Sequence, residues 1–383
     1  GIAGPTVAYW LLERGFSPTI VERAPALRTG GYLVDFWGAG YDVADRMRLL
    51  PALYEDGYLI DHVRLVDASG RRITGFDARV VRSATHNRFV SVMRSDLSRR
   101  IYDLLDGRVE TIFGDTITAI TQDAAGVSVA FERSEPRRFD LVIGADGLHS
   151  RVRELALGNA QSEEKFLGYY VAAFTSDSYP HRDEDAYITY SEPRRTVARY
   201  ALRGNRSTFF FIFTEDEMLD TDPHDVAKQK AVLRDKFSSV GWECPEILNA
   251  LGPADDFYFD SVSQMRMTNW SRGRVVLLGD AAYCPSLLAG EGSGLAMAGA
   301  YVLTDALCVT GGDHLAAFSR YQDRFKPFVD KKQRAATRMA WWFAPRSKLQ
   351  IWMRDVTTRL MNAPYLGPRL IAQSFVDSYQ LPA

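Results

Sequence analysis

The stretch that decides the fold runs from Arg274 to Gly294 and reads RVVLLGDAAYCPSLLAGEGSG. An apolar run ends in Gly279-Asp280, and after a loop three glycines occupy the last five positions. The Ala-rich segment 295–307 then predicts a helix. Glycines let a ligand approach the backbone closely, and the free amides at a helix N-terminus favour a negatively charged group. This order therefore predicts a ligand site, with a flexible loop as the alternative.

A second motif opens the chain. Gly1 and Gly4 precede an apolar helical pattern over 7–12 that Gly15 ends, and a β-branched run then leads to Glu22. Dinucleotide-binding units consist of a strand, the motif G-x-G-x-x-G, a helix, and a second strand that ends in an acidic residue. We therefore expect the first strand and the first glycine of this motif, about ten residues, to lie upstream of Gly1. Glu22 follows Gly4 by 18 residues, near the offset of about 20 for a ribose-binding carboxylate. The alternative is that Gly1 and Gly4 are ordinary loop glycines and that Glu22 is a carboxylate in solvent.

A third motif lies between these two. Residues 139–145 read as a buried strand, and the turn dipeptide Asp146-Gly147 follows it. The hydroxyl of Ser150 is placed to cap a helix that starts at Arg151. Taken alone, this pattern fits any strand, turn and helix.

Composition excludes several classes of protein. The 383 residues suggest two or three domains, and 46 basic against 48 acidic residues give a formal net charge of −2. Neither nucleic acid nor an anionic membrane is expected as a partner, because both select for excess positive charge. Three cysteines without a CxxC pair favour a reducing compartment, which we take to be the cytoplasm, with no metal site. We see no signal peptide and no apolar run near 18 residues.

Together these motifs resemble the class A FAD-dependent aromatic hydroxylases, which have the p-hydroxybenzoate hydroxylase fold. The resemblance rests on motifs in family order that span residues 1–307: GIAGP at 1–5, Glu22-Arg23, Arg94 with Leu97, GADGLHSRVR at 144–153, GDAAYCP at 279–285 and GEGSG at 290–294. Within the class, the chain looks most like the tetracycline-inactivating and polyketide-tailoring flavin monooxygenases. The resemblance implies an α/β fold: a Rossmann-like FAD-binding domain with an interleaved antiparallel-sheet substrate domain and C-terminal helices.

The resemblance also implies which residues hold the nucleotide half of FAD. Gly1 and Gly4 would lie under the pyrophosphate. Glu22 would bind the adenosine ribose, and Arg23 would lie near the adenine or its ribose. Arg94 would reach the pyrophosphate or the ribityl chain.

For the flavin half, Asp280 would bind the ribityl chain, and the glycine pair Gly30-Gly31 would lie beside the flavin. The amides of Gly290, Gly292 and Ser293 would face the N1 and O2 edge of the flavin. The turn Asp146-Gly147 would touch both FAD and NAD(P)H. The chain has Leu287 and Leu288 where many relatives have proline, and Glu291 where many have glutamine. We expect the Glu291 side chain to face solvent.

The chemistry implied by the resemblance belongs to the cofactor. NADPH or NADH reduces the flavin, O2 then gives a C4a-hydroperoxide, and its distal oxygen hydroxylates an electron-rich carbon of a phenolic, polyketide or tetracycline-like substrate. Antibiotic modification or biosynthesis is the implied setting. The protein must exclude water and supplies no nucleophile, so no catalytic residue is assigned. The alternatives are an FAD-dependent reductase or dehydrogenase, and a binding protein that has lost FAD.

Residues 165–215 predict successive aromatic and β-branched strands, which we interpret as an antiparallel sheet over the flavin. We expect Arg199 and Phe211 on this sheet, and Trp37 from the FAD side, to line the substrate pocket. The alternatives are a solvated arginine and core phenylalanines.

The two domains are expected to interleave along the chain. The FAD-binding domain would comprise 1–70, 90–160 and 265–310, the substrate domain 71–89 and 161–264, and a helical segment 311–383. Apolar residues in the tail, among them Trp341, Trp352 and Leu349, predict a helix packed across both domains, with a membrane-surface helix as the alternative. The oligomeric state is left open.

Overall fold

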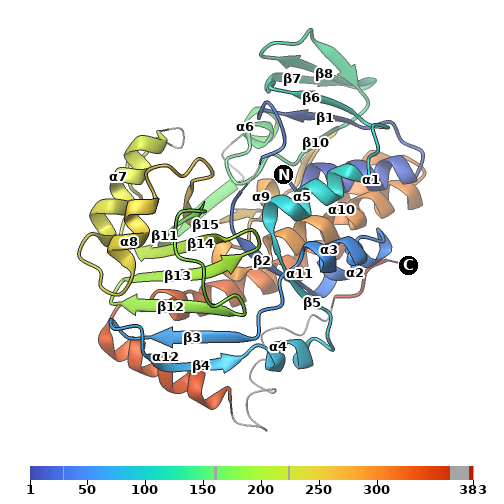
Figure 1. The fold of residues 1–383 in the computed structure, drawn as a ribbon. Helices are drawn as coiled ribbons and strands as arrows, with labels where there is room; N and C mark the ends of the chain where they lie inside the picture. Colours follow the sequence, from blue (N-terminus) through green and yellow to red (C-terminus); the bar gives the residue numbers. More distant parts are fainter. Residues whose placement is uncertain (29, 159–161, 223–224, 363–378, 383) are drawn as a thin grey trace.

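The computed structural model describes residues 1–28, 30–158, 162–222, 225–362 and 379–382. Two layers lie side by side (Figure 1): one gathers the glycine-rich motifs, and the other is a seven-stranded sheet with two helices on one face. Segments of the two layers alternate along the chain. The α/β fold with an interleaved sheet is thereby confirmed.

The helices agree well with the sequence pattern, since the predicted helix at 295–307 lies within α10. The helices are α1 (Ala3–Glu13), α2 (Gly38–Arg46), α3 (Leu50–Asp56), α4 (Arg79–Ala84), α5 (Arg94–Asp103), α6 (Arg151–Leu157), α7 (Val226–Phe237), α8 (Cys244–Ala250), α9 (Asp280–Tyr283), α10 (Gly292–Val309), α11 (His314–Phe343) and α12 (Lys348–Leu360), with a 3₁₀ turn η2 (Leu287–Ala289).

The strands include each one that the aromatic segments predict. They are β1 (Thr19–Glu22), β2 (Leu33–Trp37), β3 (His62–Val66), β4 (Arg72–Asp77), β5 (Phe89–Met93), β6 (Glu110–Phe113), β7 (Ile117–Asp123), β8 (Gly126–Phe131), β9 (Arg137–Phe139), β10 (Val142–Gly144), β11 (Ser162–Ser176), β12 (Ala186–Glu192), β13 (Arg195–Leu202), β14 (Arg206–Thr214), β15 (Tyr258–Met267), β16 (Ser271–Arg272) and β17 (Val275–Leu277).

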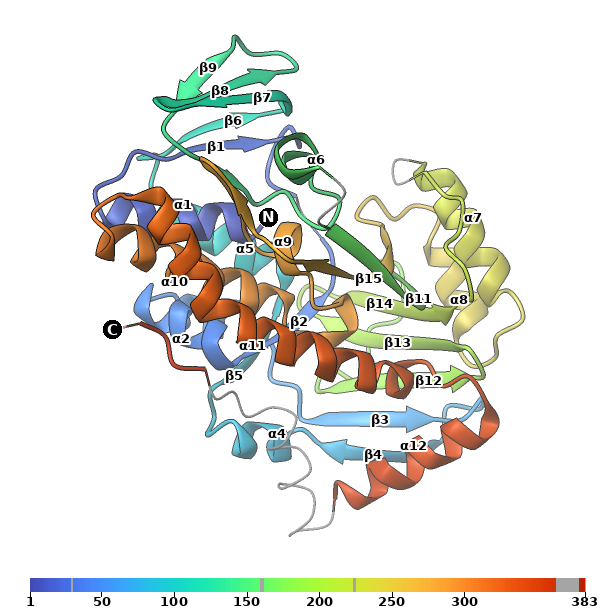
Figure 2. The ribbon, with the colours of Figure 1, turned by 180° about the vertical axis from the view of Figure 1, so that it is seen from behind.

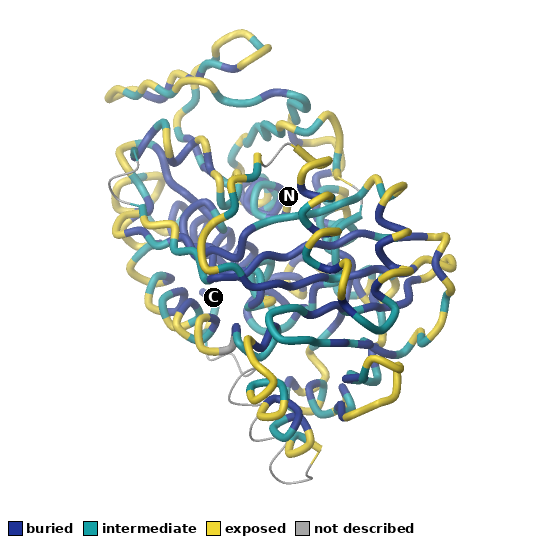
Figure 3. Tube along the Cα trace, turned by 90° about the vertical axis from the view of Figure 1, so that its left-hand side faces the viewer, coloured by how far each residue is buried: buried dark blue, intermediate teal, exposed yellow. Residues whose placement is uncertain are grey.

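Parallel strand pairs form the centre of the nucleotide-binding layer. β1 pairs with β6, and β10 pairs with β17. All three residues of β17 are fully buried, because helices and loops cover both of its faces. Burial on both faces explains why this strand reads as a continuous apolar run without alternation. The outer sheet of β7, β8 and β9 lies at the edge and is more exposed (Figure 3).

The second layer is a sheet with the strand order β15-β11-β14-β13-β12-β3-β4. All neighbouring pairs are antiparallel except β12 and β3, which run parallel. Since β3 begins at His62, this sheet takes in residues before 71, the predicted start of the sheet layer. β2 and β5 form a separate antiparallel pair, and side chains on one of its faces contact the large sheet.

Alternation along β14 decides which side chains face which neighbour. Phe209, Phe211 and Phe213 belong to the core under α7 and α8. Phe210 and Ile212 belong to a different cluster, on the opposite face, with residues of α11 and η2. Because successive residues of a strand point to opposite faces, the two sets cannot exchange sides without a shift in register.

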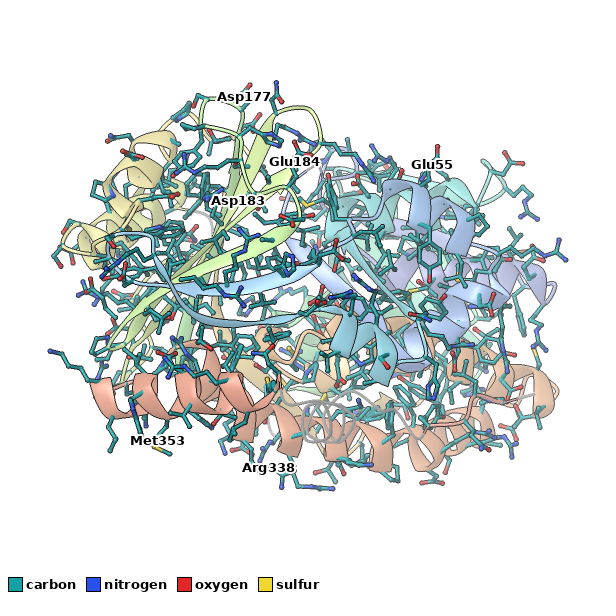
Figure 4. The ribbon with its side chains drawn as sticks, turned by 60° about the horizontal axis from the view of Figure 1, so that its bottom comes forward. Glu55, Asp177, Asp183, Glu184, Arg338 and Met353 are labelled. Carbon is teal, nitrogen blue, oxygen red and sulfur yellow. The ribbon has the colours of Figure 1, made fainter. Side chains whose placement is uncertain are left out.

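The C-terminal helices cross both layers. α11 packs on α10 and η2, and α12 lies along β4 and β12 (Figure 2). The prediction of a helix packed across both domains is therefore confirmed. The apolar residues of α12 are not its buried face, however: Leu349 is 65% and Trp352 62% exposed, and Met353 points away from the sheet (Figure 4).

Polar residues form the inner face of α12 instead. Arg354, Asp355 and Thr358 are buried, and Arg354 Nη1 donates a hydrogen bond to Ser191 Oγ at 2.7 Å. Ser191 belongs to β12, so this bond holds the helix to the sheet through a polar contact. Residues 363–378 of the predicted helical segment lie outside the described part of the chain.

One helix, α10, has the length and composition of a membrane span, with a mean hydropathy of 1.3 over 18 residues. This apolar helix differs from the expectation that the chain has no apolar run near 18 residues. Within the structure, 72% of the helix is buried, against α1, α2 and α11. Burial among other helices accounts for its apolar composition.

Candidate cofactor and substrate site

Two motifs that are far apart in the sequence, the first at the start of the chain and the second at 274–294, meet at one place. A Cβ added to Gly279, at the end of β17, would lie 3.2 Å from the Cβ of Ala3 in α1 and 3.5 Å from the Cβ of Ala296 in α10. Gly279 has φ +64°, which a residue with a side chain rarely adopts. Glycine is therefore favoured where the start of α1, the residues after β17 and the start of α10 come this close.

A buried arginine ties the Asp146-Gly147 motif to the same place. Arg153 donates from Nη1 to the carbonyl of Ala281 at 2.9 Å and from Nη2 to the carbonyl of Leu148 at 2.7 Å. Its side chain is almost fully buried, and burial lowers the pKa of Arg153. The two carbonyls therefore anchor a charged group that links the turns after β10 and β17.

The first turn of α1 lies beside the predicted ribose carboxylate. The backbone nitrogen of Gly1 is 3.5 Å from Glu22 Oε2, and Glu22 Oε1 accepts a hydrogen bond from the amide of Ala24 at 2.9 Å. Arg94 Nη2 would lie 4.0 Å from a Cβ on Gly1. A Cβ on Gly4 would meet no atom within 4 Å, so the space above this turn is open.

Arg94 and Asp280 form the charged part of the site. Burial disfavours the charge of Arg94, but Tyr32, Tyr258 and Asp280 outweigh it and the pKa of Arg94 is raised. Burial raises the pKa of Asp280, and Arg94 opposes the rise. A cation and a hydrogen-bonding carboxylate close together suit a phosphate and a hydroxylated chain.

The glycine-rich turn supplies backbone to the same space. A Cβ on Gly292 would lie 3.7 Å from Asp280 Oδ1, and one on Gly290 would lie 3.5 Å from Cη2 of Trp37. Ser293 follows in the first turn of α10, and no side chain caps that turn. The amides of this turn are therefore placed to receive an acceptor from a ligand.

The turn at Asp146-Gly147 has a structural role. Asp146 Oδ1 accepts from Ser150 Oγ at 2.5 Å, and Oδ2 accepts from the amide of Val152 at 3.0 Å. Ser150 in turn accepts from the amide of Arg153, as the predicted N-cap of α6. Gly147 has φ +85° with open space around its Cα.

The segment after β1 runs toward the large sheet. Gly30 fits only as glycine, because an added Cβ would lie 2.2 Å from the Cβ of Asp256. Asp256 accepts hydrogen bonds from the amide and hydroxyl of Thr175 in β11. Gly31, with φ +110°, has open space beside it, and Arg23 is exposed.

Glu291 does not face solvent, contrary to the sequence expectation. Its Oε1 pairs with Nζ of Lys332 in α11 at 2.5 Å, and the two side chains are only 15% and 11% exposed. The pair connects α11 to the residue that precedes α10. The negative charge of Glu291 at this helix start is therefore balanced by a partner 41 residues away.

The structure does not bring Arg199 and Phe211 to this site. Phe211 packs edge-on against Phe237 of α7, with ring centroids 4.9 Å apart. Arg199 pairs with Asp183 at 2.8 Å and Glu243 at 2.9 Å on the same outer face. Both predictions fail for the same reason, since these residues point to the sheet face under α7 and α8.

Their neighbours in the strands take the inner positions. Phe210 contacts Tyr32 with ring centroids 5.8 Å apart, and Tyr32 contacts Tyr258 at 5.4 Å. Trp37 lies beside the glycine turn and stacks on Phe89 with ring centroids 6.1 Å apart, and its place in the substrate pocket stays a prediction. Aromatic side chains thus line the space between the layers, drawn from β14, β15 and β2.

Sequence reasoning also missed a polar pair in this space. Asp35 lies on the same face of β2 as Trp37, and its Oδ1 accepts from Ser91 Oγ of β5 at 2.5 Å. Asp35 and Trp37 line a small cavity of about 20 Å³ together with Gly290. The sequence shows this residue as the one carboxylate in the apolar run LVDFW at 33–37, and that pattern could have indicated it.

The residues at these turns fit FAD as a ligand. Uncapped helix amides, Arg94 beside Gly1, and Asp280 beside Gly292 offer partners for a pyrophosphate and a ribityl chain. Open space lies over Gly4, Gly31 and Gly147.

Comparison with known proteins agrees with this fit. The sequence pattern of the family described as "FAD binding domain" matches residues 1–334. An uncharacterized protein of Mycobacterium tuberculosis is 37% identical over 334 residues, covering 87% of this chain and 89% of its own. A flavin-dependent monooxygenase of Legionella longbeachae is 34% identical over 350 residues, covering 87% and 85%. The crystal structure of tetracycline destructase Tet(51) superimposes with a TM-score of 0.86 at 30% identity, covering 100% and 97%.

Proposed function

This chain belongs to the FAD binding domain family and is an FAD-dependent monooxygenase, and on that premise we propose its reaction. It uses NADPH or NADH and O2 to hydroxylate a phenolic, polyketide or tetracycline-like aromatic substrate. When bound and reduced, FAD would supply an electrophilic oxygen from O2. The setting that we propose is antibiotic modification or biosynthesis in the cytoplasm.

The single observation that carries this proposal is the close approach of the three turns at Gly279. We assign Glu22 and Arg23 to the adenosine end of FAD and the turn at Gly1 and Gly4 to its pyrophosphate. We assign Arg94 to the pyrophosphate or the ribityl chain, and Asp280 to the ribityl chain. The assignments at the flavin are Gly31, Gly290, Gly292 and Ser293, and the turn Asp146-Gly147 would touch FAD and NAD(P)H. These residues bind and orient the cofactor.

The substrate would lie between the glycine turn and the large sheet. Trp37, Phe210, Tyr32 and Tyr258 line that region with aromatic rings. Flat aromatic molecules stack on such rings, and an apolar lining excludes water that would divert the oxygen. A tetracycline destructase among the similar structures supports a polycyclic substrate.

The domain division is part of this proposal. The FAD-binding domain comprises 1–70, 90–160 and 265–310, apart from β3, whose pairing with β12 assigns it to the sheet. The substrate domain comprises the sheet with 71–89 and 161–264. α11 and α12 join the two.

The test uses the purified full-length protein. We expect a yellow protein that binds FAD, oxidises NADPH or NADH faster when a suitable phenol is added, and forms a product heavier by one oxygen atom. Consumption of the nicotinamide without O2 dependence would instead identify a reductase or dehydrogenase. A protein that takes up no FAD would refute the proposal.

A further inference from the structure

A second cavity lies on the outer face of the large sheet, the face that α7 and α8 cover. Its volume is about 480 Å³, within the range of about 300–1,000 Å³ that is usual for small-molecule sites. Val66 of β3 and Ile188 of β12 line it, and both belong to the core under α7 and α8, whereas Phe210 belongs to the opposite face. The sheet therefore separates this cavity from the glycine turns, and the proposed reaction does not use it.

Charged side chains dominate the lining of this cavity. Its acids are Asp183, in the loop before β12 (Figure 4), and Glu243, directly before α8. Its arginines come from two strands of the sheet edge, one inner strand and the loop before β12: Arg64, Arg72, Arg199 and Arg182. Four positive charges against two negative ones leave the lining with a net charge of +2.

Each of the two acids is shared between two arginines. Arg199, which is 2% exposed, lies 2.8 Å from Asp183 through Nη2 and 2.9 Å from Glu243 through Nε. Arg64 pairs with Asp183 at 3.1 Å, and Arg182 pairs with Glu243 at 2.6 Å. Among the described residues, no atom accepts a hydrogen bond from the buried Nε of Arg199 despite its short distance to Glu243. Two carboxylates thus hold this network in place without neutralising it.

Arg72 is the cation that the network leaves over. It lies on β4 at the edge of the sheet, is exposed, and its guanidinium makes no hydrogen bond or ion pair within the part of the chain that the structure describes. Asp185 lies 3.8 Å from Arg64 but is 48% exposed, so water and salt screen its charge. A guanidinium with free donors offers a planar fork to the oxygens of a phosphate or a carboxylate.

Trp242 gives the same cavity an aromatic wall. An added Cβ on Gly70 would lie 3.7 Å from Nε1 of Trp242, so the indole rests on the turn between β3 and β4. Its ring centroid is 6.1 Å from that of Tyr190 in β12. With Val66 and Ile188 this ring forms an apolar surface next to the arginines. Flat heteroaromatic bases stack on such a surface.

We propose that this cavity binds a nucleoside monophosphate, with the phosphate at the arginines and the base against Trp242. A phosphate monoester carries about −1.5 to −2 charges at pH 7, which balances the net charge of the lining, whereas a monocarboxylate would balance half of it. The site lies outside the proposed cofactor and substrate site. Binding there makes and breaks no covalent bond.

The test titrates the holoenzyme, kept in excess FAD so that the cofactor site is filled, with AMP, GMP, CMP and UMP in a calorimeter. We expect at least one of them to bind with a Kd below about 1 mM. Ribose 5-phosphate, which lacks the base, and inorganic phosphate should each bind about 10-fold more weakly than that nucleotide.

Two arginines that are neighbours in the chain provide a matched pair of variants. Arg72→Gln removes the free guanidinium and should weaken nucleotide binding about 5-fold or more. Arg71→Gln is the control, because Arg71 is 83% exposed, lies outside the cavity lining and carries the same charge. It should change the affinity by less than about 2-fold.

A third variant, Trp242→Leu, tests the aromatic wall. It should reduce the preference for the nucleotide over ribose 5-phosphate to about 3-fold or less. If this variant does not fold, the same comparison in the wild-type protein and the pair of arginine variants carry the test. Three results would each overturn the inference: no nucleotide binding below about 1 mM, equal binding of ribose 5-phosphate or inorganic phosphate, or an Arg72→Gln protein that binds as Arg71→Gln does.

Discussion

Replacing Lys332 by methionine tests whether the start of α10 is built as described. The change removes the ion-pair partner Lys332 from a Glu291 carboxylate that is 15% exposed next to the glycine turn. Removing one partner of a buried ion pair costs about 3–5 kcal/mol, and the slight exposure of this pair places the expected loss near 3 kcal/mol. The lost charge balance also lies where we place the flavin, so FAD should dissociate about 10-fold more readily.

The assay is urea unfolding followed by tryptophan fluorescence, with FAD affinity measured separately. Glu291→Gln combined with Lys332→Met removes both charges and should recover about half of the lost stability. Arg334→Met is the matched control, because it removes a positive charge from the exposed side of the same helix and should change stability by less than about 0.5 kcal/mol. A Lys332→Met protein as stable as this control, or a double variant no better than the single one, would refute the reasoning.

The remaining predictions concern Arg153, Gly279, His149 and the two faces of β14. Arg153→Met leaves the carbonyls of Ala281 and Leu148 without their donor and should cost about 2–4 kcal/mol in urea unfolding. Gly279→Ala adds a Cβ 3.2 Å from Ala3 at φ +64°, so thermal unfolding should show a loss of about 1–3 kcal/mol and less bound FAD. Asp260 raises the pKa of His149 through a contact of 3.4 Å. The protonated histidine should therefore stabilise the fold by less than about 1 kcal/mol below pH 6.5, and this stabilisation should be lost as the pH rises through the pKa of the folded state. His149→Gln should abolish this pH dependence of stability. Phe211→Ala should cost about 3–5 kcal/mol of stability in urea unfolding, whereas Phe210→Ala should chiefly weaken substrate binding in a ligand titration. Equal effects of the two variants would contradict the assignment of these side chains to opposite faces of the sheet.

Local patterns were sufficient to predict the elements that form the candidate cofactor site. The run Val275–Leu278 predicts a buried strand because both faces of β17 are covered, and Gly292–Gly294 open the helix that follows. Ser150 caps α6 as its spacing indicates. These features depend on neighbouring residues, which is why one sequence reveals them.

Features that depend on long-range pairing were not predicted. Whether Phe210 or Phe211 faces the flavin side depends on the register between β14 and β11, and a shift of one residue reverses the answer. Glu291 was expected in solvent because its partner, Lys332, lies on a helix far along the chain. The apolar residues of α12 suggested a buried face, yet Arg354 and Asp355 occupy it because Ser191 offers a hydrogen bond.

A crystal structure of the full-length protein with FAD is the most direct test of the central claim. We expect the pyrophosphate beside Gly1 and Arg94, the ribityl chain at Asp280, and the flavin ring against Gly290 and Gly292, within reach of Trp37. Electron density for FAD away from these turns, or side chains filling the space between them, would contradict the claim that they form one site.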